Sequence, residues 1–222
     1  MAPSPSYETS VFINCPFDRT YRPLFEAVVF ATCDCGFNPR TALEVDDSSE
    51  VRIQKIIRII AQSRLSIHDI SRTQLDRDTR LPRFNMPLEL GIFIGAKAFG
   101  GPEHECKAAI VLDAERYRYQ KYISDIAGQD VRAHGRNAAE AVRQVRAFLS
   151  THCPLGTILP GSDTIIGRYN RFRGGLVRTC SELHVRPAEL SFRDISTLMV
   201  AWLRNHPLPG PEPAIPQTSR AS

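Results

Sequence analysis

The sequence lacks the long apolar runs and the paired cysteines that would assign it to several common classes. No apolar segment reaches the ~20 residues that a membrane-spanning helix needs. The first ten residues have neither the basic region nor the apolar region of a secretory signal. The six cysteines include no C-x-x-C pair, which argues against a disulfide framework and against a zinc site. We therefore expect a cytoplasmic protein without a metal ion, in which most cysteines are small core residues.

Charge of one sign is also scarce. The 28 Lys and Arg residues exceed the 24 Asp and Glu residues by only +4, so composition alone does not indicate a polyanionic partner. One basic and aromatic stretch, residues 168–173 with Arg178, could contact nucleic acid. Such a stretch is more often a solvated helix face or an interface with the core, so we do not expect nucleic acid as a partner.

The signature motifs of several enzyme classes are missing. The sequence contains no G-x-x-x-x-G-K-[ST], no G-x-G-x-x-G and no G-x-S-x-G, which excludes a P-loop enzyme, a standard dinucleotide oxidoreductase and a serine hydrolase. The P-C-x-x-C of the zinc deaminases is absent too. His68 beside Asp69 could act as a base, although a histidine at a strand end is more often a hydrogen-bonded structural residue.

What is present is a regular alternation of strand-like and helix-like segments. Short apolar runs predict strands, and segments with apolar residues at helical spacing predict helices between them. This order is typical of an α/β fold with a doubly wound parallel sheet of about five strands. The predicted strands are residues 10–14, 37–43, 64–69, 107–112 and 131–133; the predicted helices begin at Asp18 or Thr20, at Ser48 or Ser49, and at residues 86 and 137, and Gly36 ends the first of them.

The pattern changes after Pro154. No further strand-like run follows, and two or three helices are expected between residues 163 and 204. Ser191 and Asp194 have the spacing of a capping box. From Pro207 onward five prolines fall within ten residues, which is typical of a flexible tail. We therefore expect a flexible N-terminus at residues 1–9, an α/β domain at 10–150, a helical C-terminal domain at 151–206 and a disordered tail at 207–222.

Glu89 is the most informative single residue. It is the one acid in the segment 86–97, which is apolar around nearly its whole circumference and so predicts a helix buried on several sides. A buried carboxylate is costly unless it is paired or has a task. Pro87 marks the first turn, so the helix dipole should favour the ionised form, which suits a nucleophile or an electrostatic stabiliser. The alternative is a first-turn residue that points to solvent. Gly91 and Gly95 indicate either a close approach of backbone or ligand, or close helix–sheet packing.

Other polar residues follow the predicted strands. In an open parallel sheet ligands bind beyond the carboxyl ends of the strands, so the segments to consider are 14–18, 44–49, 69–85 and 113–117. Two of these segments are rich in polar side chains, namely Asn14 and Asp18 in the first, and Asp69, Ser71, Arg83 and Asn85 in the third.

Three motifs resemble those of the TIR-like and nucleoside 2-deoxyribosyltransferase-like superfamily. They are FINCPFD at residues 12–18, HDIS at 68–71 and NMPLELGIFIGAK at 85–97, and the similarity covers about residues 10–150. The resemblance implies a flavodoxin-like α/β core that cleaves or transfers at an N-glycosidic bond, with NAD+ or a related nucleotide as substrate and no cofactor. The loop between Ser71 and Asn85 is longer than the compact form of the family, and the simple transferases lack a helical appendage.

The resemblance also implies roles for individual residues. Glu89 matches the nucleophile that attacks the anomeric carbon in the transferases, and a Glu on the corresponding helix engages the nicotinamide riboside in TIR-type NADases. Asp69 and Asn85 would clamp the sugar hydroxyls, while Asn14 and Phe17 would line the base. The remaining expected substrate-binding residues are Asp18, Ser71 and Arg83.

Two hypotheses about function follow. The first is an N-glycosidase that serves as a defence or stress effector, as small stand-alone bacterial proteins of this kind do. The second is a non-catalytic nucleotide sensor or TIR-like assembly module. In either case the resemblance implies a homo-oligomer, and residues 117–130 either close the pocket or complete the site of a neighbouring copy.

Overall fold

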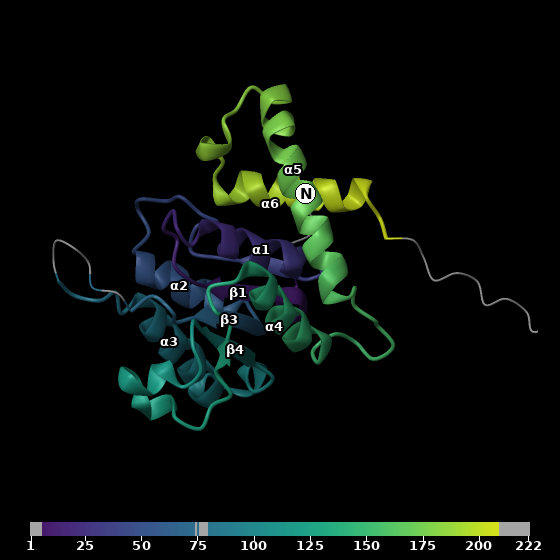
Figure 1. Cartoon of the computed structure of the whole chain (residues 1–222). Coiled ribbons are helices and arrows are strands. Elements are labelled where there is room, and N and C mark those ends of the chain that lie inside the picture. The colour runs from purple at the N-terminus through teal and green to yellow at the C-terminus, as the bar shows by residue number, and fades with distance from the viewer. Residues whose placement is uncertain (1–5, 74, 76–79, 209–222) are drawn as a thin grey trace, which may run out of the picture.

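The computed structural model describes residues 6–73, 75 and 80–208. These residues form a five-stranded parallel sheet in the order β2-β1-β3-β4-β5, with helices on both faces (Figure 1). The predicted α/β class is therefore confirmed, and the strand order is that of a flavodoxin-like doubly wound sheet. The strands are β1 (Ser10–Asn14), β2 (Asn38–Arg40), β3 (Leu65–Asp69), β4 (Ala108–Asp113) and β5 (Arg132–Ala133).

Strands β1 and β3 form the centre of the sheet and are buried at every position. A strand covered on both faces has no solvent side, so its sequence is a continuous apolar run rather than an alternating one. This is why the bounds of β1 could be predicted from the sequence. β2 is shorter than the predicted strand at 37–43, because the chain turns after Arg40, where the Thr41 hydroxyl accepts the N–H of Leu43.

The helices that flank the sheet form one layer on each face. α1 (Arg22–Asp34) and α4 (Ala138–Ser150) cover one face, and α2 (Arg52–Ala61) and α3 (Asn85–Phe99) cover the other (Figure 1). Successive side chains of β1 point to opposite faces of the sheet. Val11 and Ile13 pack with α1 and α4, whereas Phe12 packs with α2 and α3. No helix in the described part of the chain has the length and hydropathy needed to cross a membrane.

Short 3-10 helices lie in the connections. They span Tyr7–Thr9, Pro102–His104, Arg118–Lys121, Ser124–Ile126 and Pro187–Glu189.

Some of the predicted helix ends are confirmed and others are wrong. Asn137 caps α4 by accepting the N–H groups of Ala139 and Glu140, and Gly36 follows α1 with a φ of 80°. Asp18 accepts the N–H groups of Thr20 and Tyr21 in a turn before α1, so the helix itself begins later than predicted.

The serine cap predicted for α2 is also wrong. Val51 is its N-cap, and Ser49 instead donates its N–H and its hydroxyl to Asp47.

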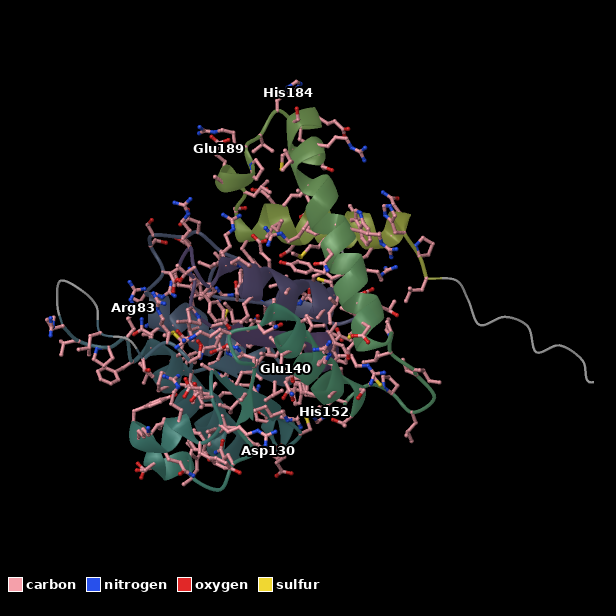
Figure 2. All side chains as sticks on the ribbon, viewed as in Figure 1. Arg83, Asp130, Glu140, His152, His184 and Glu189 are labelled. Carbon is pink, nitrogen blue, oxygen red and sulfur yellow. The ribbon has the colours of Figure 1, made fainter. Side chains whose placement is uncertain are left out.

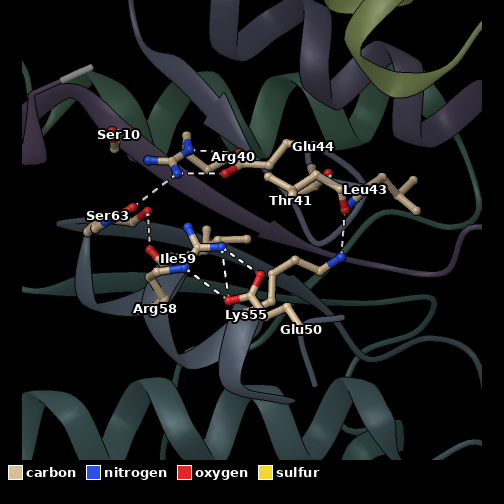
Figure 3. Close-up of polar contacts among 12 residues, drawn as sticks. Ser10, Arg40, Thr41, Leu43, Glu44, Glu50, Lys55, Arg58, Ile59 and Ser63 are labelled. Carbon is tan, nitrogen blue, oxygen red and sulfur yellow. Dashed lines mark hydrogen bonds and ion pairs between the residues drawn. The ribbon is translucent and has the colours of Figure 1, made fainter. Parts of the chain in front are cut away.

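Ion pairs and a hydrogen bond from a lysine to a backbone carbonyl hold the connection between β2 and α2 (Figure 3). Arg40 forms two hydrogen bonds, of 2.7 and 2.6 Å, to the carboxylate of Glu44, and Lys55 donates to the Val45 carbonyl at 2.6 Å. Glu44 belongs to one of the segments that the sequence placed at the ligand edge. Its carboxylate is already paired within the protein.

The C-terminal segment adds two helices, α5 (Ser162–Glu182) and α6 (Phe192–Asn205), which cross each other on the outside of α1 (Figure 1). The ring centroid of Phe30 in α1 lies 5.6, 5.6 and 5.9 Å from the ring centroids of Tyr169, Phe172 and Trp202, respectively. The capping box predicted at Ser191 and Asp194 is confirmed at the start of α6.

One apolar cluster joins these helices to the sheet layer, and the predicted boundary between domains at residue 151 stays a prediction. Residues 1–5 and 209–222, which make up most of the predicted flexible ends, lie outside the described residues.

The basic and aromatic stretch of α5 faces the core. Arg168 is buried and its Nε lies 3.1 and 3.0 Å from the two carboxylate oxygens of Asp34 in α1. Tyr169 and Phe172 are buried beside it, whereas Arg171 is exposed. Arg168, Tyr169 and Phe172 therefore hold α5 against α1, and Arg171 faces solvent.

Helix α3 is less buried than its sequence predicted. Its buried residues are Met86, Glu89, Leu90 and Phe93, while Leu88 is 56% exposed. The prediction that this helix is covered around nearly its whole circumference is wrong, because the sheet, α2 and the segment around Tyr119 and Ile126 cover one side of it and leave Leu88 and Gly91 exposed.

Close helix–sheet packing at the two glycines of α3 is not found. Apart from the neighbouring backbone of the helix itself, no atom of the described residues lies within 4 Å of a Cβ built on Gly91 or Gly95, and the approach of a ligand there stays a prediction.

Replacing Arg168 by alanine tests the attachment of α5. The substitution leaves the 4%-exposed carboxylate of Asp34 without its partner, so we expect the free energy of unfolding to fall by about 3–5 kcal/mol in urea denaturation. Arg171→Ala, on the exposed side of the same helix, is the control and should change it by less than about 0.5 kcal/mol. Equal effects of the two variants would show that the ion pair does not hold the helix.

Candidate functional site

The candidate site lies where the carboxyl ends of β1 and β3 meet. In a sheet of this order the connections from β1 and β3 leave in opposite directions, which opens a crevice between the two strand ends. Asn14 is the last residue of β1 and Asp69 is the last residue of β3, and helix α3 begins nearby because Asn14 contacts Met86. The candidate residues predicted from the sequence belong to this edge. Of these, the fold brings Asn14, Asp69 and the helix of Glu89 together.

Glu89 lies in the second turn of α3 and is only 6% exposed. Burial raises the pKa of its carboxyl from 4.5 to about 7, and the positive charge of Arg52 at the start of α2 opposes this only in part. The shift is opposite to the one predicted from the helix dipole, because the loss of solvation outweighs the dipole. The group therefore titrates near neutral pH, which is the range expected of an acid–base catalyst.

The thiol of Cys15 lies among the acids of this edge. Burial raises its pKa well above the ordinary value, and the negative charges of Asp69, Glu89 and Asp18 raise it further. Cys15 therefore stays protonated and is no nucleophile. Its surroundings show that carboxylates from β3, from α3 and from the loop after β1 gather around one point.

Asp69 is 1% exposed and both of its oxygens have partners within the protein. Oδ1 accepts the Ser71 N–H at 2.8 Å, and Oδ2 accepts the hydroxyl of Tyr21. Nε2 of His134, just after β5, lies 2.9 Å from Oδ2. Asp69 thus connects the segments after β1, β3 and β5. Its predicted role as a sugar clamp stays a prediction.

The imidazole of His134 has a defined orientation. Its Nδ1 accepts the N–H of Arg136 at 3.0 Å, so the ring proton belongs on Nε2, beside Asp69. Nε2 and the Asp69 carboxylate are in close contact, although Nε2 has no hydrogen bond of good geometry among the described residues.

Asn14 and His68 are turned toward the protein. The amide of Asn14 donates to the Met86 carbonyl at 2.9 Å and lies 2.9 Å from Nδ1 of His68. Burial lowers the pKa of His68 to about 3, so the ring is neutral at physiological pH and the structural interpretation of this histidine is favoured over a catalytic base. Asn14 was expected to line the base; it holds the first turn of α3 against β1, which positions Glu89.

Phe17 and Asp18 are partly open to solvent. Phe17 is 37% exposed and packs edge-on against Phe25. The carboxylate of Asp18 lies 3.3 Å from Nε of Arg72. Burial acts to raise the pKa of Asp18, but the Thr20 hydroxyl and Arg72 lower it below its usual value, so this group is ionised.

The other predicted residues stand along the segment between β3 and α3. Ser71 is 8% exposed, and its carbonyl accepts a 2.8 Å bond from Arg118. Arg83 and Asn85 are exposed, and Figure 2 shows Arg83 at the margin of the molecule from which α3 begins. Residues 74 and 76–79 of the long predicted loop lie outside the described residues.

Three supporting residues were missed in the sequence. Arg118 and Tyr122 both bond to Asp113, at 2.9 Å from Nε and 2.9 Å from the hydroxyl, and Arg118 also donates to the Ser71 carbonyl. They belong to the aromatic stretch that we expected to close a pocket or complete a neighbour's site. Through Asp113 and the Ser71 carbonyl, they hold the segment after β3 in place. His134 was missed because β5 has only two residues and gives little strand signal.

Comparison with known sequences does not identify a family for this chain. The chain matches no protein-family model, and no curated protein is significantly similar to it. Within the described residues, no group of three or more His, Cys, Asp or Glu side chains is placed to hold a metal ion.

Glu89→Gln tests whether burial controls this carboxylate. The folded pKa of about 7 is above the ordinary 4.5, so the folded state holds the proton more tightly and wild-type stability is lost as pH rises through 7. We expect the variant and the wild type to be equally stable below pH ~4.5, and the variant to be more stable by up to about 3 kcal/mol above pH ~8. Urea denaturation across this range measures the difference.

The matched control is Glu26→Gln. Glu26 is also 6% exposed, but it pairs with Arg22 at 2.7 Å, so its loss should destabilise the protein at neutral pH. A Glu89→Gln variant that shows no growing advantage with pH would mean that the carboxylate is stabilised by a partner in the folded protein.

Proposed function

We propose that this protein is an N-glycosidase that cleaves the bond between base and ribose in NAD+ or a related nucleotide, with Glu89 as its catalytic carboxylate. One observation carries the proposal. A single carboxylate with a pKa near 7 is buried on the helix that begins at the carboxyl edge of β1 and β3, and it has no ion pair among the described residues. Maintaining such a group costs stability, which is expected of a functional site.

The chemistry suits a carboxylate of this kind. An oxygen of Glu89 attacks the anomeric carbon as the bond to the base breaks, and the base leaves with the bonding electrons. Water then attacks the same carbon, loses a proton and releases Glu89 as the carboxylate. The transition state resembles an oxocarbenium ion, so a negative oxygen beside it is stabilising. A raised pKa makes Glu89 more basic and thus a better nucleophile than an ordinary carboxylate.

The surrounding residues support this role by positioning. Asn14 fixes the first turn of α3, and Arg52 provides the positive charge that keeps part of the Glu89 population ionised. The three motifs that resemble the TIR-like and deoxyribosyltransferase-like superfamily include Asn14, Asp69 and Glu89. Membership of that superfamily, and a role as a defence or stress effector, belong to this proposal.

A second candidate function is a nucleotide sensor or assembly module that binds without cleaving. Two observations favour it. Both oxygens of Asp69 already have partners, so the expected sugar clamp is occupied. In addition, α3 exposes Leu88 and Phe99, which is 91% accessible, and such apolar side chains suit contact with a second copy. Recovery of intact ligand after long incubation would favour this function over the first.

The deciding experiment is release of free base. The purified protein is incubated with NAD+, NADP+, nucleosides and deoxynucleosides, and the products are separated by chromatography. We expect base release by the wild type and a loss of at least about a thousandfold in Glu89→Gln, because the attacking oxygen is replaced by an amide.

Glu26→Gln is the matched control and should keep full activity, since Glu26 is equally buried but lies on α1 beside Arg22. Full activity of Glu89→Gln would refute the assignment. Absence of base release from every substrate, with a ligand bound intact, would support the sensor.

A further inference from the structure

A second feature of the same edge is a cavity of about 380 Å³ on the side of α1 and α4. Its volume is near the lower end of the ~300–1,000 Å³ range of small-molecule sites. Segments that follow three different strands contribute its walls. The lining side chains that matter here are Thr20 and Tyr21 after β1, Ser71 and Arg72 after β3, and His134 and Arg136 after β5.

The floor of this cavity is rigid. Tyr21 and His134 both contact Oδ2 of Asp69, one through its hydroxyl and the other through Nε2 at 2.9 Å. Both side chains are therefore fixed before a ligand arrives, which lowers the entropic cost of binding.

The walls are positively charged. Arg72 and Arg136 line the cavity, and no acidic residue is among the described residues that do so. Arg136 is exposed and its guanidinium has no ion-pair partner in the described part of the chain. Arg72 is 38% exposed and contacts Asp18 through Nε, which leaves its other donors available. The hydroxyls of Thr20 and Ser71 add polar groups between the two arginines.

These groups fit an oxyanion with several acceptor oxygens. The two guanidinium groups provide donors from different sides, the Ser71 hydroxyl adds a third, and guanidinium groups bind phosphate oxygens in pairs.

The cavity and Glu89 lie on the two sides of the same pair of strand ends. The lining residues Tyr21 and His134 contact Asp69 at the end of β3, while Asn14 at the end of β1 holds the first turn of α3, the helix that carries Glu89. A ligand that extends from the cavity across the ends of β1 and β3 therefore approaches the helix of Glu89.

We propose that this cavity binds a phosphate group of the ligand whose glycosidic bond lies at Glu89, so that the substrate class is a nucleotide and not a free nucleoside. The assignment of the substrate class rests on the proposed function, whereas phosphate binding does not. Arg72 and Arg136 are the principal binding residues.

The test measures the binding of inorganic pyrophosphate and ribose 5-phosphate to the full chain. The readout is the broadening of the ³¹P NMR lines of each probe at low salt. We expect both probes to broaden with the wild type. Arg136→Asn should weaken binding about 10- to 100-fold, as loss of a charge-assisted hydrogen bond does, and Arg72→Gln should weaken it similarly. Asparagine is chosen at 136 because the backbone φ there is 57°, which asparagine tolerates well.

Arg143→Ala is the matched control, since it removes the same charge from the exposed face of α4 outside the cavity. Its binding should equal that of the wild type. Absence of broadening with the wild type would overturn the proposal, and so would equal weakening by Arg143→Ala, which would indicate only general attraction of anions. Circular dichroism melts establish that each variant is folded.

A second arm separates this inference from the proposed function. Glu89→Gln should bind both phosphate probes as the wild type does, so a protein without glycosidase activity still tests the cavity. If base is released equally well from a nucleoside and from its 5′-phosphate, and Arg136→Asn changes neither, the substrate class is wrong while the glycosidase stands.

Discussion

The carboxylate of Asp69 is the constraint on which the edge of the sheet depends. It is buried at the end of β3, accepts hydrogen bonds from Tyr21 and from the backbone after β3, and contacts Nε2 of His134. A buried charge is tolerated only where hydrogen bonds replace its lost hydration, and here each replacement comes from a different strand connection. The arrangement of the three connections, and hence the cavity beside them, follows from satisfying this one group.

Glu89 shows the opposite solution to the same problem. It is as inaccessible as the structural glutamate Glu26, yet Glu26 pairs with Arg22 while Glu89 has only the more distant charge of Arg52. The protein thus keeps one acid at its ligand edge with its hydration incompletely replaced. The resulting pKa near 7 lies in the range where a carboxyl group can exchange a proton at neutral pH. Asp69 is bonded within the protein, whereas Glu89 has the properties that the proposed reaction needs.

The two C-terminal helices stabilise this arrangement from outside. α5 and α6 pack on α1, and the Arg168–Asp34 pair and the rings around Phe30 fix them there. Helix α1 in turn begins with Tyr21 at its N-cap, whose hydroxyl reaches Asp69. The appendage is therefore connected through one helix to the floor of the cavity, which gives it a physical route for affecting the site.

The sequence by itself determined the order of strands and helices and the parallel sheet, and it singled out Glu89 as a candidate. Strands buried on both faces and amphipathic helices leave local patterns, and a single acid in an apolar helix is visible without a structure. Only the tertiary structure decided which polar residues meet. The contacts of Asp69 with Tyr21 and His134 join residues that are far apart in the chain, and the ionisation of Glu89 depends on solvation lost to other elements. Neither quantity is local, so no pattern along the sequence contains it.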